Sequence, residues 1–503
     1  MSERDPLTRR VFLTRAARLV LTLGATPLLG AGTAVRGQTP YAGGVWLGGD
    51  HHIHTKYSVD GRYEIGEQVD AAARTGLDFC VITDHGGPGH DKVALTRAYP
   101  ELLAARKRNP NLIVFQGLEW NIPAAEHGSV ILAPTDDEAE IVADFESRFD
   151  ARNLTRQTGE LDAIEGVKYL QALRDRPLFI ANHPARRGYD SPHELRNWAD
   201  AGPDVMRGFE GAPGHGAATF VGELRGHYVE NPGPTSFPGY PLSSYRTFGG
   251  YDYYVAQVGG LWDSLLGEGR AFYITANSDS HRYFGDQRVV HRETYKTLGY
   301  VTLTSETEPT VPGQPHHDTD YPPGMYCQTR VYAARRDALA VMAGMRAGNM
   351  YTVLGGLIDG LQLWAHDGEQ AAPMGSTLLL PRPGATVEVV FTITLAQRPN
   401  LGGSRPVLHH IDLIAGQITG RVADRDTLGN PTTRVVARLR MSDGERRGNT
   451  VTFRHRFQGV QNSFYVRIRG TNTEVLAPQL DPPGINPWLD LWFYSNPIMI
   501  RLP

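Results

Sequence analysis

Histidines and carboxylates at short spacings are the residues of this chain whose types suggest chemistry. His52 and His54 are separated by a single residue in the stretch from Gly49 to Thr55. Alternate residues of an extended segment face the same way, so both imidazoles can bind one metal ion. A hydrogen-bonded pair in a loop explains this spacing equally well. The case for a metal site therefore depends on further donors elsewhere in the chain.

Such donors recur next to short apolar runs, which we expect to be buried β-strands. These runs are residues 45–47, 77–83, 112–115, 130–132, 178–181, 205–209 and 271–275. Residues that can bind a metal follow most of these runs, and one precedes the fourth: His52, His54, His85, Glu119, His127, His183, Asp279 and His281. The donors are thus concentrated at one end of the expected strands.

The segments between these runs have the apolar spacing of amphipathic helices. Six or seven alternating units predict an α/β fold, either a parallel barrel or a doubly wound sheet. In a parallel barrel the loops that follow the strands converge on one rim, where active sites lie. Each donor taken singly is explained as an ordinary loop histidine or turn residue. Their common position indicates a site with several ligands.

Composition narrows the chemistry further. The chain has 503 residues, with 50 basic and 54 acidic residues and a net charge of -4, which gives no basic footprint for nucleic acid. Cys80 and Cys327 are the only cysteines, which excludes a disulfide framework and a cysteine-rich zinc module. Imidazoles and carboxylates must therefore hold any metal, and this donor set suits zinc, manganese or iron.

The ordered motifs resemble those of the PHP (polymerase and histidinol phosphatase) family. The resemblance rests on Asp50-His51-His52-Ile53-His54-Thr55, Ser58-Val59-Asp60-Gly61, Asp84-His85, Gly117-Leu118-Glu119, His127, Asn182-His183-Pro184 and Asn277-Ser278-Asp279-Ser280-His281. It covers roughly residues 45–300. It implies a distorted (β/α)7 barrel of the PHP type that holds two or three divalent metal ions. The family's usual Ser-Asp-Gly is here interrupted by Val59.

The resemblance also implies three groups of ligands. The first ion would be held by His52, His54, Glu119 and Asp279. The second would be held by Glu119, His127 and His183, with Glu119 bridging the two ions. The third would be held by Asp60, His85 and His281.

Two ions about 3.5–4 Å apart can share a hydroxide and clamp the oxygens of a phosphoryl group. We therefore expect a metal-dependent phosphoesterase that hydrolyses a small phosphate mono- or diester through a metal-bridging hydroxide. The expected catalytic residues are His52, His54, Glu119 and Asp279.

Three arginines next to the later ligands are candidates for substrate binding: Arg186, Arg187 and Arg282. A planar guanidinium can bind two phosphate oxygens at once. Solvated arginines beside the loops are the alternative interpretation.

Two other functions remain open. A metallohydrolase acting on an amide, a lactone or a phosphotriester would use the same hydroxide. An envelope protein that holds metal and binds a partner would need no reaction. The substrate in either hydrolytic case is small, and the sequence does not indicate an oligomeric state.

The first 37 residues have the pattern of a targeting signal rather than of a folded element. Arg9 and Arg10 form a twin-arginine pattern ahead of a moderately apolar segment, residues 19–25, and a stretch of small residues. We expect twin-arginine export to the periplasm or the medium. The apolar segment is short, so no stable membrane span is expected after removal of the signal.

The pattern changes near residue 355. Residues 45–355 are the expected barrel domain, and residues 356–503 are an expected small, all-β, sandwich-like domain. The second range has β-type runs separated by Pro, Gly and Asn and no helical periodicity. The β-type runs are residues 361–364, 387–393, 410–414, 451–453, 464–468 and 498–500.

Overall fold

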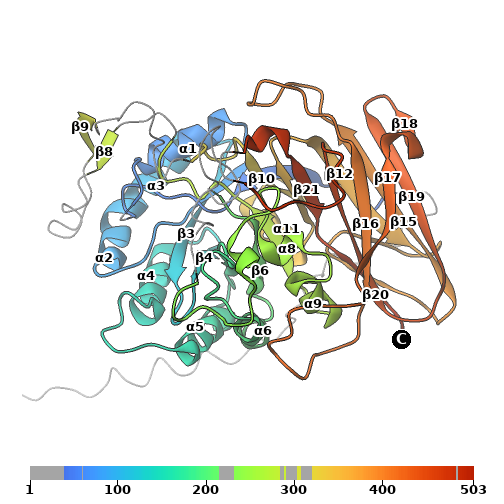
Figure 1. The fold of residues 1–503 in the computed structure, drawn as a ribbon. Coiled ribbons are helices and arrows are strands. Elements are labelled where there is room, and N and C mark those ends of the chain that lie inside the picture. Colours follow the sequence, from blue (N-terminus) through green and yellow to red (C-terminus); the bar gives the residue numbers. More distant parts are fainter. Residues whose placement is uncertain are drawn as a thin grey trace, which may run out of the picture.

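A computed structural model describes residues 39–58, 60–214, 232–283, 288–290, 303–307, 320–482 and 485–503. The predicted export signal, residues 1–37, and the inserted Val59 lie outside these ranges. Figure 1 shows a half rich in helices, coloured blue to green, beside a half made largely of strands, coloured orange to red.

Seven strands of the first half lie side by side in the order of the sequence. They are β1 (Val45–Asp50), β2 (Phe79–Ile82), β3 (Ile113–Asn121), β4 (His127–Ile131), β5 (Leu178–Ala181), β6 (Met206–Ala212) and β7 (Tyr273–Ala276). The curved sheet closes through β10 (Cys327–Ala333), which pairs antiparallel with β1. Thr329 on β10 also bonds through its hydroxyl to the backbone of Ala276 on β7. The expected α/β fold is confirmed.

Helices pack around this sheet (Figure 1). They are α1 (Ile65–Arg74), α2 (His90–Val93), α3 (Tyr99–Arg108), α4 (Glu138–Phe149), α5 (Glu160–Ala172), α6 (Pro192–Ala201), α8 (Tyr253–Ala256), α9 (Leu261–Gly267) and α11 (Ala338–Ala347). Helix α11 contributes to the apolar cluster inside the sheet. A π-helical turn, Ala94–Ala98, joins α2 to α3. On α1 the apolar residues Ile65, Val69 and Ala72 recur at helical spacing and are buried, so this helix packs one face on the sheet.

Local sequence signals set the ends of several helices. Ser191 accepts a hydrogen bond from the backbone N–H of Glu194, and Pro192 occupies the first turn of α6. Asp337 caps α11 in the same way, and Gly348 ends it in the left-handed conformation (φ 71°) that glycine adopts without strain.

The direction of β4 differs from the parallel arrangement that the sequence predicts. β4 runs antiparallel to both β3 and β5, whereas β1, β2 and β3 are parallel, as are β5, β6 and β7. Only residues 122–126 connect β3 to β4, and so short a connection makes a hairpin rather than a crossover. The start of β4, where His127 lies, therefore meets the carboxyl ends of the parallel strands.

The second half is built from strands, as expected, in two sheets. One sheet has the order β13-β12-β15-β19-β18, and the other contains β14, β22, β20, β21, β16 and β17. Their bounds are β12 (Ile358–His366), β13 (Ala371–Pro373), β14 (Thr377–Leu379), β15 (Ala385–Leu395), β16 (His410–Gln417), β17 (Arg434–Arg440), β18 (Glu445–Arg447), β19 (Thr450–Val460), β20 (Phe464–Thr471), β21 (Trp492–Ser495) and β22 (Ile498–Arg501). All pairs are antiparallel except β14 with β22.

The two halves share a sheet. Strand β11 (Met350–Leu354) pairs with β10 on one side and with β21 on the other, which joins the barrel sheet to the second sheet of the β half. The domain boundary at residue 355 stays a prediction, and it falls directly after this shared strand. A separate pair, β8 (Arg288–Val290) and β9 (Leu303–Thr307), lies apart from both sheets.

Apolar side chains from facing strands fill the barrel. Leu47, Phe79, Phe115 and Ile180 belong to one buried cluster inside it.

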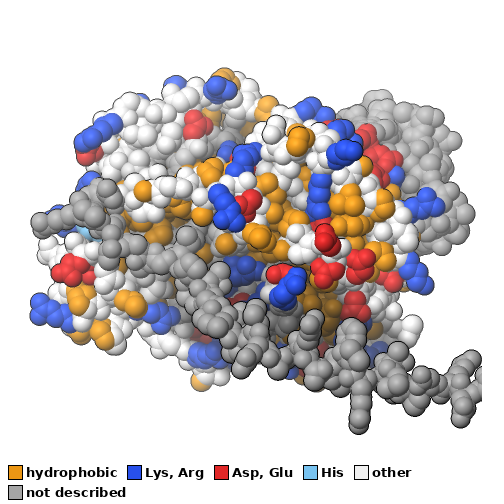
Figure 2. All heavy atoms as spheres, turned by 180° about the vertical axis from the view of Figure 1, so that it is seen from behind, with side chains coloured by type: hydrophobic (Ala, Val, Ile, Leu, Met, Phe, Trp, Pro, Cys, Tyr) orange, Lys and Arg blue, Asp and Glu red, His pale blue; other side chains and the backbone are white. Residues whose placement is uncertain are grey.

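Within the described ranges, no helix combines the length and apolarity needed to cross a membrane. On the face shown in Figure 2, basic and acidic side chains are interspersed and histidine hardly appears.

Candidate metal centre

The first group of predicted ligands converges on one point at the rim of the barrel. The Nε2 atoms of His52 and His54 lie 3.0 Å apart, and Asp279 Oδ1 lies 3.1 Å from each. The oxygens of Glu119 lie 3.1 Å from His52 Nε2 and 3.2 Å from His54 Nε2. Donors bound to one zinc ion at about 2.0–2.1 Å in tetrahedral geometry lie roughly 3.3 Å apart. Each of the two carboxylates therefore lies at about this spacing from both imidazoles.

The second group shares Glu119 with the first. Glu119 Oε1 lies 3.2 Å from His127 Nδ1 and 3.2 Å from His183 Nε2. Its other oxygen lies 2.9 Å from His85 Nδ1. Glu119 is only 1% exposed, and imidazoles from five positions of the chain lie around it. This carboxylate is the centre of the site.

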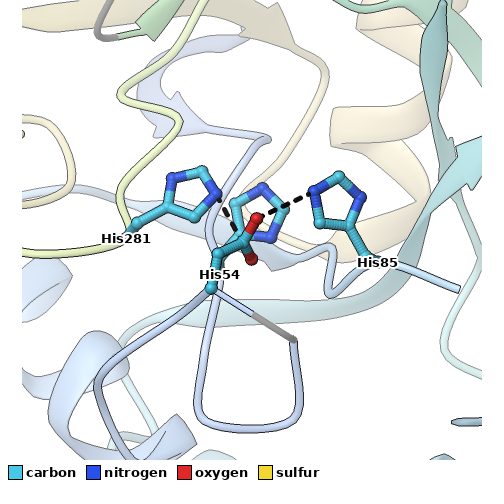
Figure 3. A group of neighbouring side chains, drawn as sticks. His54, His85 and His281 are labelled. Atoms are coloured by element: carbon cyan, nitrogen blue, oxygen red, sulfur yellow. Dashed lines mark ion pairs between the residues drawn. The ribbon is translucent and has the colours of Figure 1, made fainter. Parts of the chain in front are cut away.

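The third group is more open. His85 Nε2 lies 3.3 Å from Asp60 Oδ2, and His281 Nε2 lies 3.6 Å from Asp60 Oδ1. Figure 3 shows the rings of His85 and His281 directed from opposite sides towards a carboxylate beside His54. The side chain of Asp60 is 35% exposed, the largest value among the predicted ligands. The ring of His85 faces Glu119 with one nitrogen and Asp60 with the other, so it joins this group to the second.

Hydrogen bonds to the far ring nitrogens decide which nitrogen faces the centre. His281 Nδ1 lies 2.8 Å from the backbone oxygen of Asp279, which directs Nε2 towards Asp60. The Ser58 hydroxyl lies 3.1 Å from His54 Nδ1 and donates to Asp60 (2.7 Å). Such contacts fix the tautomer of a metal-binding histidine and the orientation of its ring.

Backbone strain is concentrated at two of the predicted ligands. His183 (φ 29°) and Asp279 (φ 48°) are two of the three non-glycine residues with positive φ in the described ranges. A backbone in this region costs of order 1–3 kcal/mol and persists where its surroundings hold it. Asp50 accepts a hydrogen bond from Ser278 N, beside Asp279, at 3.1 Å. Asn182, beside His183, accepts one from Ser129 N at 2.9 Å.

The charges of the site depend on one another. Burial alone would raise the pKa of Glu119, but His85, His52 and His127 hold this pKa well below its usual value. Burial alone would lower the pKa of His85, yet Glu119 and Asp60 raise it to about 9. Burial and then the charge of Arg186 lower the pKa of His183 to about 3, so this imidazole is neutral and able to bind a cation.

Two donor nitrogens of the site lie beside carboxylate oxygens without the geometry of a hydrogen bond. His85 Nδ1 and His127 Nδ1 are buried and make no hydrogen bond with any described residue, although Glu119 oxygens lie 2.9 and 3.2 Å away. A nitrogen beside an oxygen without the geometry of a hydrogen bond is expected where both atoms face a common ion. The set contains imidazole and carboxylate and no thiolate, as zinc, manganese and iron accept.

The predicted substrate-binding arginines differ in their surroundings. Arg186 is 8% exposed and forms an ion pair with Glu126. Burial opposes its charge, but Glu126 and then Asp279 raise the pKa of Arg186. Arg282 is 5% exposed and follows His281, and Arg187 is partly exposed. The charges of the predicted ligands Asp279 and Glu119 therefore act on Arg186.

Three further carboxylates at the site were not among the predicted ligands. Glu126 lies 3.5 Å from His183 Nδ1, Asp320 lies 3.6 Å from His281 Nδ1, and Glu210 lies 2.7 Å from His52 Nδ1. Glu210 ends a predicted strand, which is the only signal for it in the sequence. Glu126 and Asp320 come from irregular segments, and no spacing marks them.

Comparison with known proteins gives one match to a family. Residues 50–174 match the family model for the PHP domain. This range contains the first six of the predicted ligands and ends before the last three, which are His183, Asp279 and His281. The matched range belongs to the α/β half of the structure, which an antiparallel β-domain follows. No curated protein matches the chain.

Several solved structures are similar at low identity. One is a two-domain protein from Bacteroides vulgatus containing a predicted PHP-like metal-dependent phosphoesterase (16% identity, 87% of this chain, 94% of that chain, TM-score 0.35). Endonuclease Q with a 27-mer duplex substrate is another (18%, 37% of this chain, 48% of that chain, TM-score 0.23). A third is an amidohydrolase from Chromobacterium violaceum (17%, 31% of this chain, 50% of that chain, TM-score 0.15).

Proposed function

We propose that this chain, whose residues 50–174 match the PHP domain, is a metal-dependent phosphoesterase acting on a small phosphate mono- or diester. The observation that carries the proposal is the position of Glu119. Its two oxygens lie within 3.2 Å of nitrogens of His52, His54, His85, His127 and His183. A buried carboxylate among so many imidazoles is suited to bridge two cations.

The ligands divide among the ions as follows. His52, His54, Glu119 and Asp279 would hold the first ion, and Glu119, His127 and His183 the second. Asp60, His85 and His281 would hold a third. When bound, divalent ions supply Lewis acidity and lower the pKa of water towards neutrality.

The cationic side chains beside the ligands support a phosphorylated substrate. Glu126 holds the guanidinium of Arg186 in a buried ion pair near Asp279 and Glu119. A guanidinium fixed in this way is preorganised to donate to phosphate oxygens without losing further side-chain freedom. Arg282 and Arg187 are further candidates, since each adjoins the segment of a predicted ligand.

The test is hydrolysis by the metal-loaded protein of p-nitrophenyl phosphate, bis(p-nitrophenyl) phosphate, a phosphotriester and simple amides. Turnover of a mono- or diester that disappears in His54→Ala supports the proposal. Elemental analysis of protein purified without chelator should find at least two ions per chain. Turnover of only the triester or the amides, or less than one ion per chain, would overturn it.

We also propose that residues 1–37 direct twin-arginine export, so that the protein acts in the periplasm or outside the cell. The support is the Arg9-Arg10 pair ahead of a short apolar segment. Replacing both arginines with lysine keeps the charge but removes the signal. The expected result is retention of the full-length protein in the cytoplasm. Export of this variant at the wild-type rate would contradict the assignment.

A further inference from the structure

Glu210 on β6 connects two of the ligand groups. Its side chain is fully buried, and each of its oxygens has its own partner. Oε1 lies 2.7 Å from His52 Nδ1, and Oε2 accepts a hydrogen bond of 2.7 Å from the backbone N–H of His183. One carboxylate thus contacts the ring of a ligand in the first group and the backbone of a ligand in the second.

The contact with His52 sets the orientation of that ring. A carboxylate accepts but does not donate, so His52 carries its proton on Nδ1. The lone pair of Nε2 then faces the first group, where Glu119 and Asp279 each lie 3.1 Å away. A carboxylate in this position also makes the imidazole a stronger ligand.

The contact with His183 stabilises a strained backbone. At φ 29° this residue lies in a region that side chains other than glycine rarely adopt. The segment is held from two sides, because Glu210 accepts from His183 N and Asp252 accepts from Ala185 N at 3.0 Å. This geometry directs His183 Nε2 towards Glu119 at 3.2 Å.

We propose that Glu210 is a positioning residue that aligns the ligands of both ions sharing Glu119. Loss of an ordinary ligand lowers the affinity for the ion that it binds. Loss of Glu210 should lower the affinity for two ions that it does not contact. The inference rests on the proposed function only in that the ligand groups bind metal. It does not depend on which ester is cleaved.

Glu210→Ala and Glu210→Gln separate the two contacts. Alanine removes both acceptors, and we expect the affinity for each of two ions to fall by about ten- to a hundredfold. Glutamine keeps an oxygen for His52 Nδ1–H but places its NH2 group against the N–H of His183. The affinity for the second ion, which His183 would bind, should then fall as in the alanine variant. The affinity for the first ion, which His52 would bind, should change by less than threefold.

The measurement is titration of chelator-treated full-length protein with Zn2+ against a chromophoric competitor, together with elemental analysis. The spectrum of the Co2+-loaded protein reports ligand geometry without any substrate. Glu194→Gln on α6 is the matched control, because this carboxylate is also buried (6% exposed) but contacts Ser191, the residue that caps α6. It should bind both ions like the wild type.

Wild-type affinity for both ions in Glu210→Gln would overturn the inference, even if the alanine variant fails to fold. An equal loss in Glu194→Gln would overturn it too, since any buried carboxylate would then have this effect. A wild-type protein that binds no ion would refute both the inference and the proposed function. Normal metal results with no ester hydrolysis would refute only the proposed reaction.

Discussion

Two regions of this molecule bury charged side chains, and they do so differently. Between the barrel and the β-domain, Asp263 on α9 binds Arg467 on β20 through two hydrogen bonds of 2.8 and 3.0 Å, with both side chains 0% exposed. Tyr465 also donates to Asp263 at 3.0 Å. At the barrel rim, carboxylates and imidazoles face one another and several nitrogens lack a hydrogen-bond partner among the described residues.

The difference separates a structural contact from a binding site. At the interface each buried charge faces one opposite charge, and the guanidinium also lies 4.5 Å from the ring centre of Trp262, although Arg467 Nη1 makes no hydrogen bond with a described residue. At the rim, Glu119, Asp279 and Asp60 each lie within 3.6 Å of ring nitrogens of at least two histidines. Several buried nitrogens at the rim, among them His85 Nδ1 and His127 Nδ1, make no hydrogen bond with a described residue, which is costly unless cations bind there.

The largest effect should come from the shared ligand. In the proposed site, Glu119→Gln removes the charge that two ions share, so we expect both ions to be lost and the proposed phosphoesterase activity to fall by more than about a thousandfold. Activity and metal content are measured on the same purified sample. Asp263→Asn, a buried carboxylate at the interface, should keep both. Full metal content in Glu119→Gln would contradict its bridging role.

The interface pair should affect stability instead. Arg467→Met leaves Asp263 buried without a counter-charge, which should lower the free energy of unfolding by about 3–5 kcal/mol. Denaturant titration measures this loss. Asp263→Asn combined with Arg467→Met should recover part of it, because neither charge then remains. The proposed phosphoesterase activity should stay near wild type in the folded fraction. A loss of bound metal in parallel with stability would contradict the distinction between a structural contact at the interface and a metal site at the rim.

Metal affinity should depend on pH. Glu119 and Asp60 raise the pKa of His85 to about 9 against the effect of burial, so its ring carries a proton at pH 7 in the metal-free protein. Metal binding must displace that proton, and affinity should rise about tenfold per pH unit per displaced proton until pH 9. Competition titrations at pH 7, 8 and 9 measure the slope. A flat profile would show that His85 binds no ion.

The smallest effect should come from the most exposed ligand. Asp60→Asn changes the third group only, and we expect metal content to fall by about one ion and affinity for the others to stay within about threefold. Asp70→Asn on α1, an exposed carboxylate that contacts Arg108, is the control. Loss of all ions in Asp60→Asn would mean that the third group organises the other two.

Much of the fold could be predicted because strands and helices leave periodic apolar patterns. The runs at 77–83 and 178–181 became β2 and β5, and Ile65 and Val69 became the buried face of α1. The reversed direction of β4 was not predicted, because an apolar run looks the same in a parallel and an antiparallel sheet. Strands β10 and β11, which join the two halves, were also not predicted.

The sequence by itself determined which donor types are present and the order in which they follow the strands. His52, His54 and Glu119 could be selected because each follows a predicted apolar run, although β3 in the structure extends to include Glu119. Only the tertiary structure decided which ring nitrogen faces inward, that Glu210 supports His52, and that Glu126 pairs with Arg186. Those contacts join residues 60–158 positions apart, and their geometry arises only when the sheet curves and brings the rim together.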